Sequence, residues 1–173
     1  YAQNTALSRL VEDLRLLAVA DAGELSLDRI TLDLALLCLD VVANFKPQTL
    51  VKKITLQMDL QPGVFFVSAD KRRIQQIINN LMQNALRYTP KHGLIKLRLS
   101  DVNGVVHLAL FNSGPQMSDQ TLANLFERFY RGDQGRDRAG GGTGLGLSIA
   151  RKLAEAHYGS LTGENHPNGG VVF

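Results

Sequence analysis

The residues best suited to chemistry are the glycines of Gly140–Ile149, which reads GGGTGLGLSI. Glycine tolerates backbone angles that other residues avoid, and it lets the chain approach a ligand closely. The apolar spacing that starts at Leu145 predicts a helix beginning inside this stretch. The first turn of such a helix offers unpaired N–H groups and a positive dipole end, so the stretch predicts a phosphate site. The alternative is a flexible loop before an ordinary helix, which the concentration of glycines disfavours.

The two commonest phosphate-binding motifs do not fit this stretch. No lysine follows the glycines, which excludes a G-x-x-x-x-G-K-[ST] loop. The preceding letters, RGDQGRDRA, are polar and irregular, so the glycines do not follow a strand as in a dinucleotide-binding fold. Another element of the chain must therefore complete the site.

A second candidate lies on the helix predicted to follow Asp70, a residue that suits a helix N-cap. Asn80 and Asn84 are four residues apart, so they present two amides on one face. Amide oxygens suit Mg²⁺, which keeps waters and substrate phosphates in its shell. The alternative is a solvated face, which isolated asparagines would favour. The apolar stripe of this helix is Ile74, Ile77, Ile78, Leu81, Met82 and Ala85, and the polar stripe is Arg73, Gln76, Asn80, Asn84 and Arg87.

Length and composition bound the class of protein. The chain has 173 residues, which suits one domain with an appendage, and 45% hydrophobic residues are typical of a soluble globular protein. The net charge is +3 and the basic residues are scattered along the sequence, a pattern that does not indicate nucleic-acid binding. No apolar run is long enough for a membrane span or signal peptide. The single cysteine, Cys38, is expected to be a buried thiol in a reducing cytoplasm. Both ends of the chain look cut.

The remaining pattern predicts the elements that position these residues. Leu7, Leu10, Leu14 and Leu17 form a short heptad seam, ended by Gly23. Its partner is either a helix outside this sequence or, nearly as well on pattern alone, the chain's own domain. Strands are expected at 54–60, 64–67 (buried), 95–99 and 105–111, with a turn at Asn103-Gly104 and a closing hairpin over 160–173. Asp33 and Ser118 are expected to cap further helices, and Gly159 to cap the glycine helix.

The segment 131–142 contains no large apolar residue and holds Arg131, Arg136 and Arg138. A segment with so few apolar contacts is expected to be mobile. An arginine-bearing loop before a phosphate site is typical of a lid, although a plain solvated loop has the same composition. The order of elements favours a mostly antiparallel or mixed sheet with helices on one face.

The sequence contains five motifs in this order: NNLMQNALRYTP, NSGP, LFERFYRGD, GGTGLGLSIARKLAEAHYG and NGGVVF. Together they resemble the catalytic and ATP-binding domain of bacterial sensor histidine kinases, over about residues 25–173. Residues 1–24 resemble the end of the second helix of the family's dimerisation and phosphoacceptor domain. The resemblance implies a two-layer α/β sandwich of the histidine-kinase and gyrase type, with the lid at about 116–142.

The resemblance also implies ligands and roles. ATP would lie between the asparagine helix and the lid, with Asn84 as the Mg²⁺ ligand and Asn80 in support. Phe126 and Phe129 would anchor the lid, and Arg87 and Arg138 are candidate phosphate stabilisers. The implied nucleotide-binding residues are Asn80, Asn84, Arg87, Tyr88, Asn112, Gly114, Phe129, Gly142, Thr143, Gly144, Leu145 and Gly146.

Asn80 separates branches of this superfamily. The gyrase, mismatch-repair and chaperone ATPases, and the anti-sigma-factor serine kinases, carry a glutamate there as general base. An asparagine cannot take a proton, so such an enzyme is expected to hydrolyse ATP poorly. It would instead transfer phosphate to a nucleophile that needs no deprotonation, such as neutral imidazole.

Two positions depart from the family's D-x-G-x-G box. Asn112 stands at the aspartate that accepts a bond from the adenine amino group, and Gln116 replaces the last glycine. The amide of Asn112 still accepts that bond without charge assistance, at a cost of about 1 kcal/mol or roughly tenfold in affinity. Gln116 is expected to stiffen the entry to the lid. A degenerate nucleotide-binding or interaction domain is the alternative that these changes leave open.

The phosphoacceptor histidine is not among the four histidines His92, His107, His157 and His166, which fall in turns, strands or helix ends. The chain is therefore expected to bind ATP without phosphorylating itself. The implied partners are its own dimerisation and phosphoacceptor domain, a response regulator receiver domain, and a second copy in a full-length homodimer, with no nucleic acid. The family places such a domain in the cytoplasm, in a parent anchored in the inner membrane.

Overall fold

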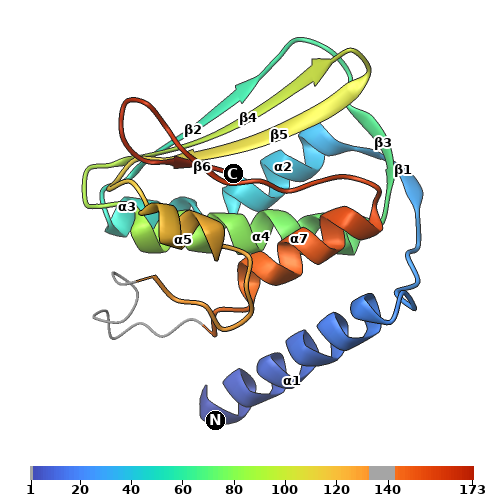
Figure 1. The fold of residues 1–173 in the computed structure, drawn as a ribbon. Helices are drawn as coiled ribbons and strands as arrows, with labels where there is room; N and C mark the ends of the chain where they lie inside the picture. The colour runs from blue at the N-terminus through green and yellow to red at the C-terminus, as the bar shows by residue number, and fades with distance from the viewer. Residues whose placement is uncertain (1, 133–142) are drawn as a thin grey trace.

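The computed structural model describes residues 2–132 and 143–173, without the side chains of residues 2–6. One sheet forms the upper layer and the helices cover its lower face, with helix α1 (Ala2–Asp21) lying beneath that helical layer (Figure 1). The expected two-layer α/β architecture, with helices on one face, is confirmed. Within the described residues, no helix combines the length and apolarity that a membrane span requires.

The main sheet has five strands in the order β2-β4-β5-β7-β6. The pair β2–β4 is parallel and the other pairs are antiparallel, which confirms a mixed, mostly antiparallel sheet. Asn103 and Gly104 join β4 to β5 with positive φ angles of 56° and 81°, as the predicted hairpin turn requires. The strands are β2 (Thr55–Leu60), β4 (Leu94–Val102), β5 (Val105–Asn112), β6 (Glu164–Asn165) and β7 (Val171–Val172).

The predicted N-caps begin three of the helices. The carboxylate of Asp33 accepts bonds from the N–H groups of Ala35 and Leu36, and Ser118 accepts one from Thr121. Such bonds satisfy backbone donors that lack a partner within the helix. Besides α1, the described helices are α2 (Leu34–Ala43), α3 (Lys46–Val51), α4 (Lys71–Tyr88), α5 (Asp119–Ala123) and α7 (Gly146–Ala156). Asp33 caps α2, Asp70 caps α4 and Ser118 caps α5.

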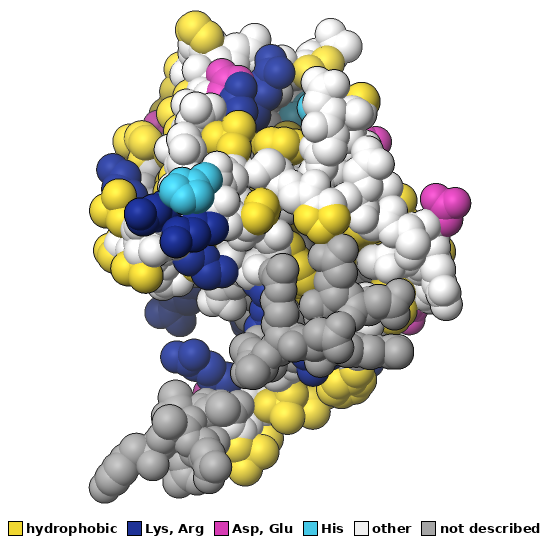
Figure 2. Space-filling view, turned by 90° about the vertical axis from the view of Figure 1, so that its left-hand side faces the viewer, with side chains coloured by type: hydrophobic (Ala, Val, Ile, Leu, Met, Phe, Trp, Pro, Cys, Tyr) yellow, Lys and Arg dark blue, Asp and Glu magenta, His cyan; other side chains and the backbone are white. Residues whose placement is uncertain are grey.

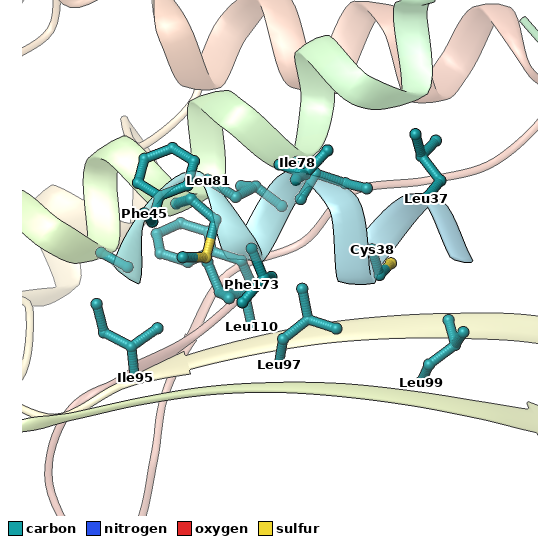
Figure 3. Close-up of a cluster of buried hydrophobic side chains, with 14 of the residues drawn as sticks. Leu37, Cys38, Phe45, Ile78, Leu81, Ile95, Leu97, Leu99, Leu110 and Phe173 are labelled. Carbon is teal, nitrogen blue, oxygen red and sulfur yellow. The ribbon is translucent and has the colours of Figure 1, made fainter. Parts of the chain in front are cut away.

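The core lies between the sheet and helices α2 and α4. The β4 residues Ile95, Leu97 and Leu99 point from the sheet toward α2 and α4 and are fully buried (Figure 3). Cys38 of α2 lies in the same cluster, and burial raises the pKa of its thiol to about 12. The expectation of a buried, neutral thiol is therefore confirmed.

A second, two-stranded sheet lies beside the main one. It pairs β1 (Ile30–Asp33) with β3 (Phe66–Ala69) in antiparallel register. The expectation of a buried strand over 64–67 is wrong, because Val64 and Phe66 are 69% and 63% exposed. The apolar run does not show that β3 belongs to a separate two-stranded sheet, one face of which is open to solvent.

Helix α1 docks on α7. Leu16 and Leu17 are buried in a cluster with Leu145, Ile149 and Leu153 of α7 and its cap, whereas Leu7, Val11 and Leu14 stay exposed. For half of the heptad seam, the second of the two predicted partners is therefore correct: the helix folds back on its own domain. Gly23 ends α1 as predicted, with φ of 72° and bonds from its N–H to Ala20 and from the Glu24 N–H to Val19.

The left-handed residue that caps the end of helix α7 lies one residue earlier than the expected Gly159. The left-handed residue is Tyr158, with φ of 63°, and the N–H of Gly159 bonds to the carbonyl of Ala154. Arg29 lies 4.6 Å from the Tyr158 ring and donates to the carbonyl of Ala156. Tyr158 therefore takes a conformation that local sequence preference assigns to Gly159, and its ring contacts a distant segment.

Asp70 links the start of α4 to two other segments. Its carboxylate accepts from the N–H groups of Arg72, Arg73 and Asp28, and its own N–H donates to Nε2 of His157 over 3.1 Å. His157 is thus structural, as expected. Burial raises the pKa of Asp70, but the backbone donors outweigh burial and hold it below its usual value.

Asp70→Ala is expected to lower the free energy of unfolding by about 1–2 kcal/mol at pH 7, because it removes the N-cap. Asp70→Asn keeps an acceptor and should lose less. Since the folded pKa is lowered, the carboxylate's contribution is complete above the unfolded pKa and is lost as pH falls through the folded pKa. Chemical denaturation at pH 7 and pH 3 checks this. An equal loss at both pH values would contradict it.

Candidate functional site

The two polar features found in the sequence line one cavity. A pocket of about 600 Å³, within the usual size of small-molecule sites, lies between α4 and the residues that precede α7. Segments from α1 and from the end of β5 complete its walls. The lining residues on which the argument depends are Arg9, Asp13, Asn80, Asn84, Arg87, Tyr88, Asn112, Gln116, Met117, Leu125, Arg131, Thr143, Gly144, Gly146 and Val171.

Asn80 of α4 has a buried polar atom that lacks a partner among the described residues. Its side-chain nitrogen Nδ2 is buried, and within residues 2–132 and 143–173 no group bonds to it. A Cβ built on Gly146 would lie 3.7 Å from Asn80 Oδ1, so this carboxamide faces the first turn of α7. Burying an unpaired polar group costs about 1–3 kcal/mol, and a ligand or water in the pocket would offset that cost.

Gly144 and Gly146, two of the three described glycines that line the pocket, differ in what the fold requires of them. Gly144 has φ of +74°, and a Cβ there would lie 2.8 Å from the Cα of Phe129. The N–H of Phe129 donates to the Gly144 carbonyl over 3.0 Å. Gly146 has no such constraint, since its added Cβ would make only ordinary contacts.

The start of α7 is open to an anion. Its N-cap, Leu145, forms no side-chain capping bond among the described residues, so N–H groups of the first turn keep their hydrogen-bonding capacity. The N–H of Leu145 itself donates to Thr143 Oγ1 over a long 3.4 Å. The helix dipole adds partial positive charge at this end.

Several predicted site residues lie elsewhere. The side chain of Phe129 is 57% exposed and off the pocket wall, so Phe129 anchors the segment through its backbone, while Phe126 packs against the core. Leu145 is buried beside Leu17. Gly114 lies behind the wall, where an added Cβ would be 3.2 Å from the Tyr88 carbonyl. Gly142, Arg136 and Arg138 lie outside the described residues.

The described part of the expected lid, 116–132, is fastened to the closing hairpin. Asn165 Oδ1 accepts from the Met117 N–H and Asn165 Nδ2 donates to the Met117 carbonyl, both over 2.8 Å. Gln116 Nε2 donates to the His166 carbonyl over 2.9 Å, which agrees with the expected stiffening. Nothing in the sequence pattern singles out Asn165, because its role depends on a segment 48 residues away.

Helix α1 supplies charged groups that sequence reasoning missed. Arg9 and Asp13 line the pocket, and their spacing of four residues is the signal that they share a face. Burial, then the nearby Glu12, raises the pKa of Asp13. At the other end of α1, Asp21 forms ion pairs with Arg128 and, at 3.8 Å, with Lys152. These pairs join α1 to the segment that precedes the glycines and to α7.

The charge of the pocket favours an anion. Lys and Arg side chains gather on the face shown in Figure 2, next to the residues drawn in grey. Three arginines line the pocket: Arg9, Arg87 and Arg131. Among the described lining residues the sole carboxylate is Asp13. A cationic cavity at a helix N-terminus suits a phosphorylated ligand.

The comparisons with known proteins agree with this geometry. The family described as histidine kinase-, DNA gyrase B- and HSP90-like ATPase matches residues 69–173. The signal transduction histidine-protein kinase BaeS of Escherichia coli is 38% identical over 165 residues, which are 95% of this chain and 35% of BaeS. The sensor protein SphS of Synechococcus elongatus is 36% identical, over 93% of this chain and 40% of SphS. The chain thus spans little more than a third of these relatives.

Solved structures give the same result. The catalytic domain of histidine kinase ThkA is 32% identical with a TM-score of 0.76, over 85% of this chain and 93% of that domain. Full-length ShkA, solved with AMPPNP, is 27% identical with a TM-score of 0.84, over 97% of this chain and 35% of ShkA. The chain belongs to the family of histidine kinase-, DNA gyrase B- and HSP90-like ATPases, in its sensor histidine kinase branch.

Proposed function

We propose that this chain binds Mg²⁺-ATP and donates the γ-phosphoryl group to a histidine on a helix outside the sequence, for relay to a response regulator. One observation carries the proposal: the asparagines of α4 and the open first turn of α7 face the same pocket. Full-length ShkA with AMPPNP and ThkA in complex with the response regulator TrrA supply the parallel.

The residues fit Mg²⁺ through amide oxygens. Among the described residues, no group of three His, Cys, Asp or Glu side chains could hold a metal alone. Asn84 and Asn80 would therefore share the ion with the nucleotide's own phosphates and with water, as Mg²⁺ prefers. When bound, the ion would neutralise phosphate charge. The buried, unpaired Nδ2 of Asn80 is a donor, so it agrees with a water or phosphate oxygen beside the ion.

The chain's own groups would act by positioning. The first turn of α7 would hold phosphate oxygens with its N–H groups, and Arg87 and Arg131 would add positive charge. Helix α4 presents amides and no carboxylate to the pocket, so it offers water no general base. A neutral imidazole needs none, which favours phosphoryl transfer to histidine over ATP hydrolysis.

The names of the relatives support a wider proposal about the whole protein. SphS is called a sensor protein and BaeS a signal transduction kinase, and this chain matches only part of each. The whole protein would be a dimeric sensor anchored in the inner membrane, with this chain as its cytoplasmic catalytic part. The exposed Leu7, Val11 and Leu14 of α1 offer an apolar face for helix pairing in that dimer.

The test is phosphorylation in trans. The chain is mixed with the histidine-bearing dimerisation domain of the full-length protein and γ-labelled ATP, with a control in EDTA. We expect acid-labile, alkali-stable label on the added domain in the presence of Mg²⁺ only. Tight ATP binding without any such label would contradict phosphotransfer and support the degenerate-domain alternative.

Asp13→Asn is expected to tighten nucleotide binding by about three- to tenfold, because it removes the one carboxylate among the described lining residues. Equilibrium binding of ADP at fixed salt measures the change. Glu12→Gln is the matched control, since it removes the same charge from an exposed neighbour that does not line the pocket. Equal gains in both variants would show a general charge effect and contradict a role for Asp13 in the pocket.

A further inference from the structure

Asn112 is a buried polar side chain whose amide the fold does not hold. It ends β5, is 4% exposed and lines the pocket. Its neighbours across the sheet are Ile95 of β4 and Val171 of β7, which are also buried. Within residues 2–132 and 143–173, no hydrogen bond engages its side-chain amide, and the polar atoms of that amide are open to the pocket and are not sealed in the core. An amide that the fold leaves unpaired at a pocket wall is available to bond a ligand there.

The contrast with Asn165 shows what a fixed amide looks like in this fold. Both polar atoms of Asn165 are bonded to the backbone of Met117, so its oxygen and nitrogen cannot exchange places without losing both bonds. The same bonds fix Met117, which lines the pocket. In contrast to Asn165, the amide of Asn112 can therefore rotate without losing a hydrogen bond to the protein.

A free carboxamide can present either of two complementary patterns. Its oxygen accepts and its nitrogen donates, and a half-turn about the terminal torsion exchanges them at little cost. Adenine offers a donor at position 6 and an acceptor at N1. Hypoxanthine and guanine offer the reverse, an acceptor at position 6 and a donor at N1. One orientation of the amide matches each class.

We propose that Asn112 reads the position-6 edge of a purine in either orientation, so that the pocket accepts 6-oxopurine nucleotides as well as adenine nucleotides. This rests on the proposed function, which places the phosphates at α7 and leaves the base for the end of the pocket at Asn112. The pocket lining also includes Met117, Leu125 and Val171, whose apolar surfaces suit the faces of a purine ring, and Val171 pairs with Asn112 across the sheet.

The test is calorimetric titration of the 173-residue chain with the Mg²⁺ complexes of ADP, IDP and GDP. ADP and IDP differ only in the edge that Asn112 would read, and GDP adds the 2-amino group. We expect the dissociation constants of ADP and IDP to agree within about tenfold. Binding of ADP with IDP weaker by about 100-fold or more would overturn this inference alone. Failure of all three to bind would overturn the proposed function and this inference with it.

The variant Asn112→Asp tests the same inference by changing the protein and not the ligand. A carboxylate only accepts, so it should keep ADP and weaken IDP by about 100-fold relative to ADP. Asn103→Asp is the matched control, because it makes the same change in the exposed β4–β5 turn. An unchanged ratio of ADP to IDP affinity in a folded Asn112→Asp protein would overturn the inference. If that variant does not fold, the comparison in the unmodified chain decides alone.

Discussion

Replacing Asn84 with alanine is expected to weaken Mg²⁺-ATP binding by about 100-fold or more. Asn84 lines the pocket on the same face of α4 as Asn80, and its amide oxygen is the proposed ligand of the ion. The loss should be largest with Mg²⁺ present, because the variant removes a metal ligand. Displacement of a fluorescent ATP analogue, with Mg²⁺ and with EDTA, measures both conditions.

Asn79→Ala is the matched control, because it removes the neighbouring asparagine of the same helix, which does not line the pocket. It should bind nucleotide as the unmodified chain does. Thermal unfolding of both variants excludes a folding defect. If Asn84→Ala kept its affinity with Mg²⁺, the assignment of the metal site would be wrong.

Gly144→Ala and Gly146→Ala are both expected to weaken nucleotide binding, but for different reasons. Alanine at 144 must adopt φ of +74° and place its Cβ 2.8 Å from the Phe129 backbone. We expect a loss of about 2–5 kcal/mol in the free energy of unfolding, and loss of nucleotide binding with it. Alanine at 146 has ordinary contacts and suits a helix, so stability should be kept or slightly raised.

Gly146→Ala should nevertheless weaken nucleotide binding by about tenfold, because the added methyl group takes space beside Asn80 and the N–H groups of the first turn. Chemical denaturation and nucleotide titration of both variants separate the two effects. A stable Gly146→Ala protein with unchanged affinity would show that phosphate does not approach this turn.

Local patterns were sufficient to predict most of the elements. The apolar stripe of α4 and its cap at Asp70 are both set by residues within one helix, and both are confirmed. The alternation in β4 placed Ile95, Leu97 and Leu99 in the core for the same reason. Patterns of this kind succeed where the signal and the structure occupy the same stretch of chain.

The exceptions depend on contacts between distant segments. Tyr158, whose ring contacts Arg29, takes the left-handed position, and Phe66 lies on the open face of the separate sheet that β3 forms with β1. The hydrogen bonds between Asn165 and Met117 join residues that are 48 positions apart in the sequence. No local periodicity reports such contacts, so sequence reasoning found the polar stripe and the glycines but missed parts of the wall.

Helix α1 bears on how the proposed kinase works. It reaches the pocket with Arg9 and Asp13, buries Leu17 against α7, and ends in the ion pairs of Asp21. A movement of α1 would therefore change the pocket's charge and the support of α7 together. The division of the chain at residues 24 and 25 remains a prediction, as do the individual ligand roles of the site residues.

Calorimetric titration of the unmodified chain with a non-hydrolysable ATP analogue, with and without Mg²⁺, tests the central claim most directly. Binding at one site per chain that strengthens when Mg²⁺ is added is the expected result, because the amides of α4 would share the ion with the phosphates. Absence of detectable binding in both conditions would contradict the claim that this pocket holds Mg²⁺-ATP.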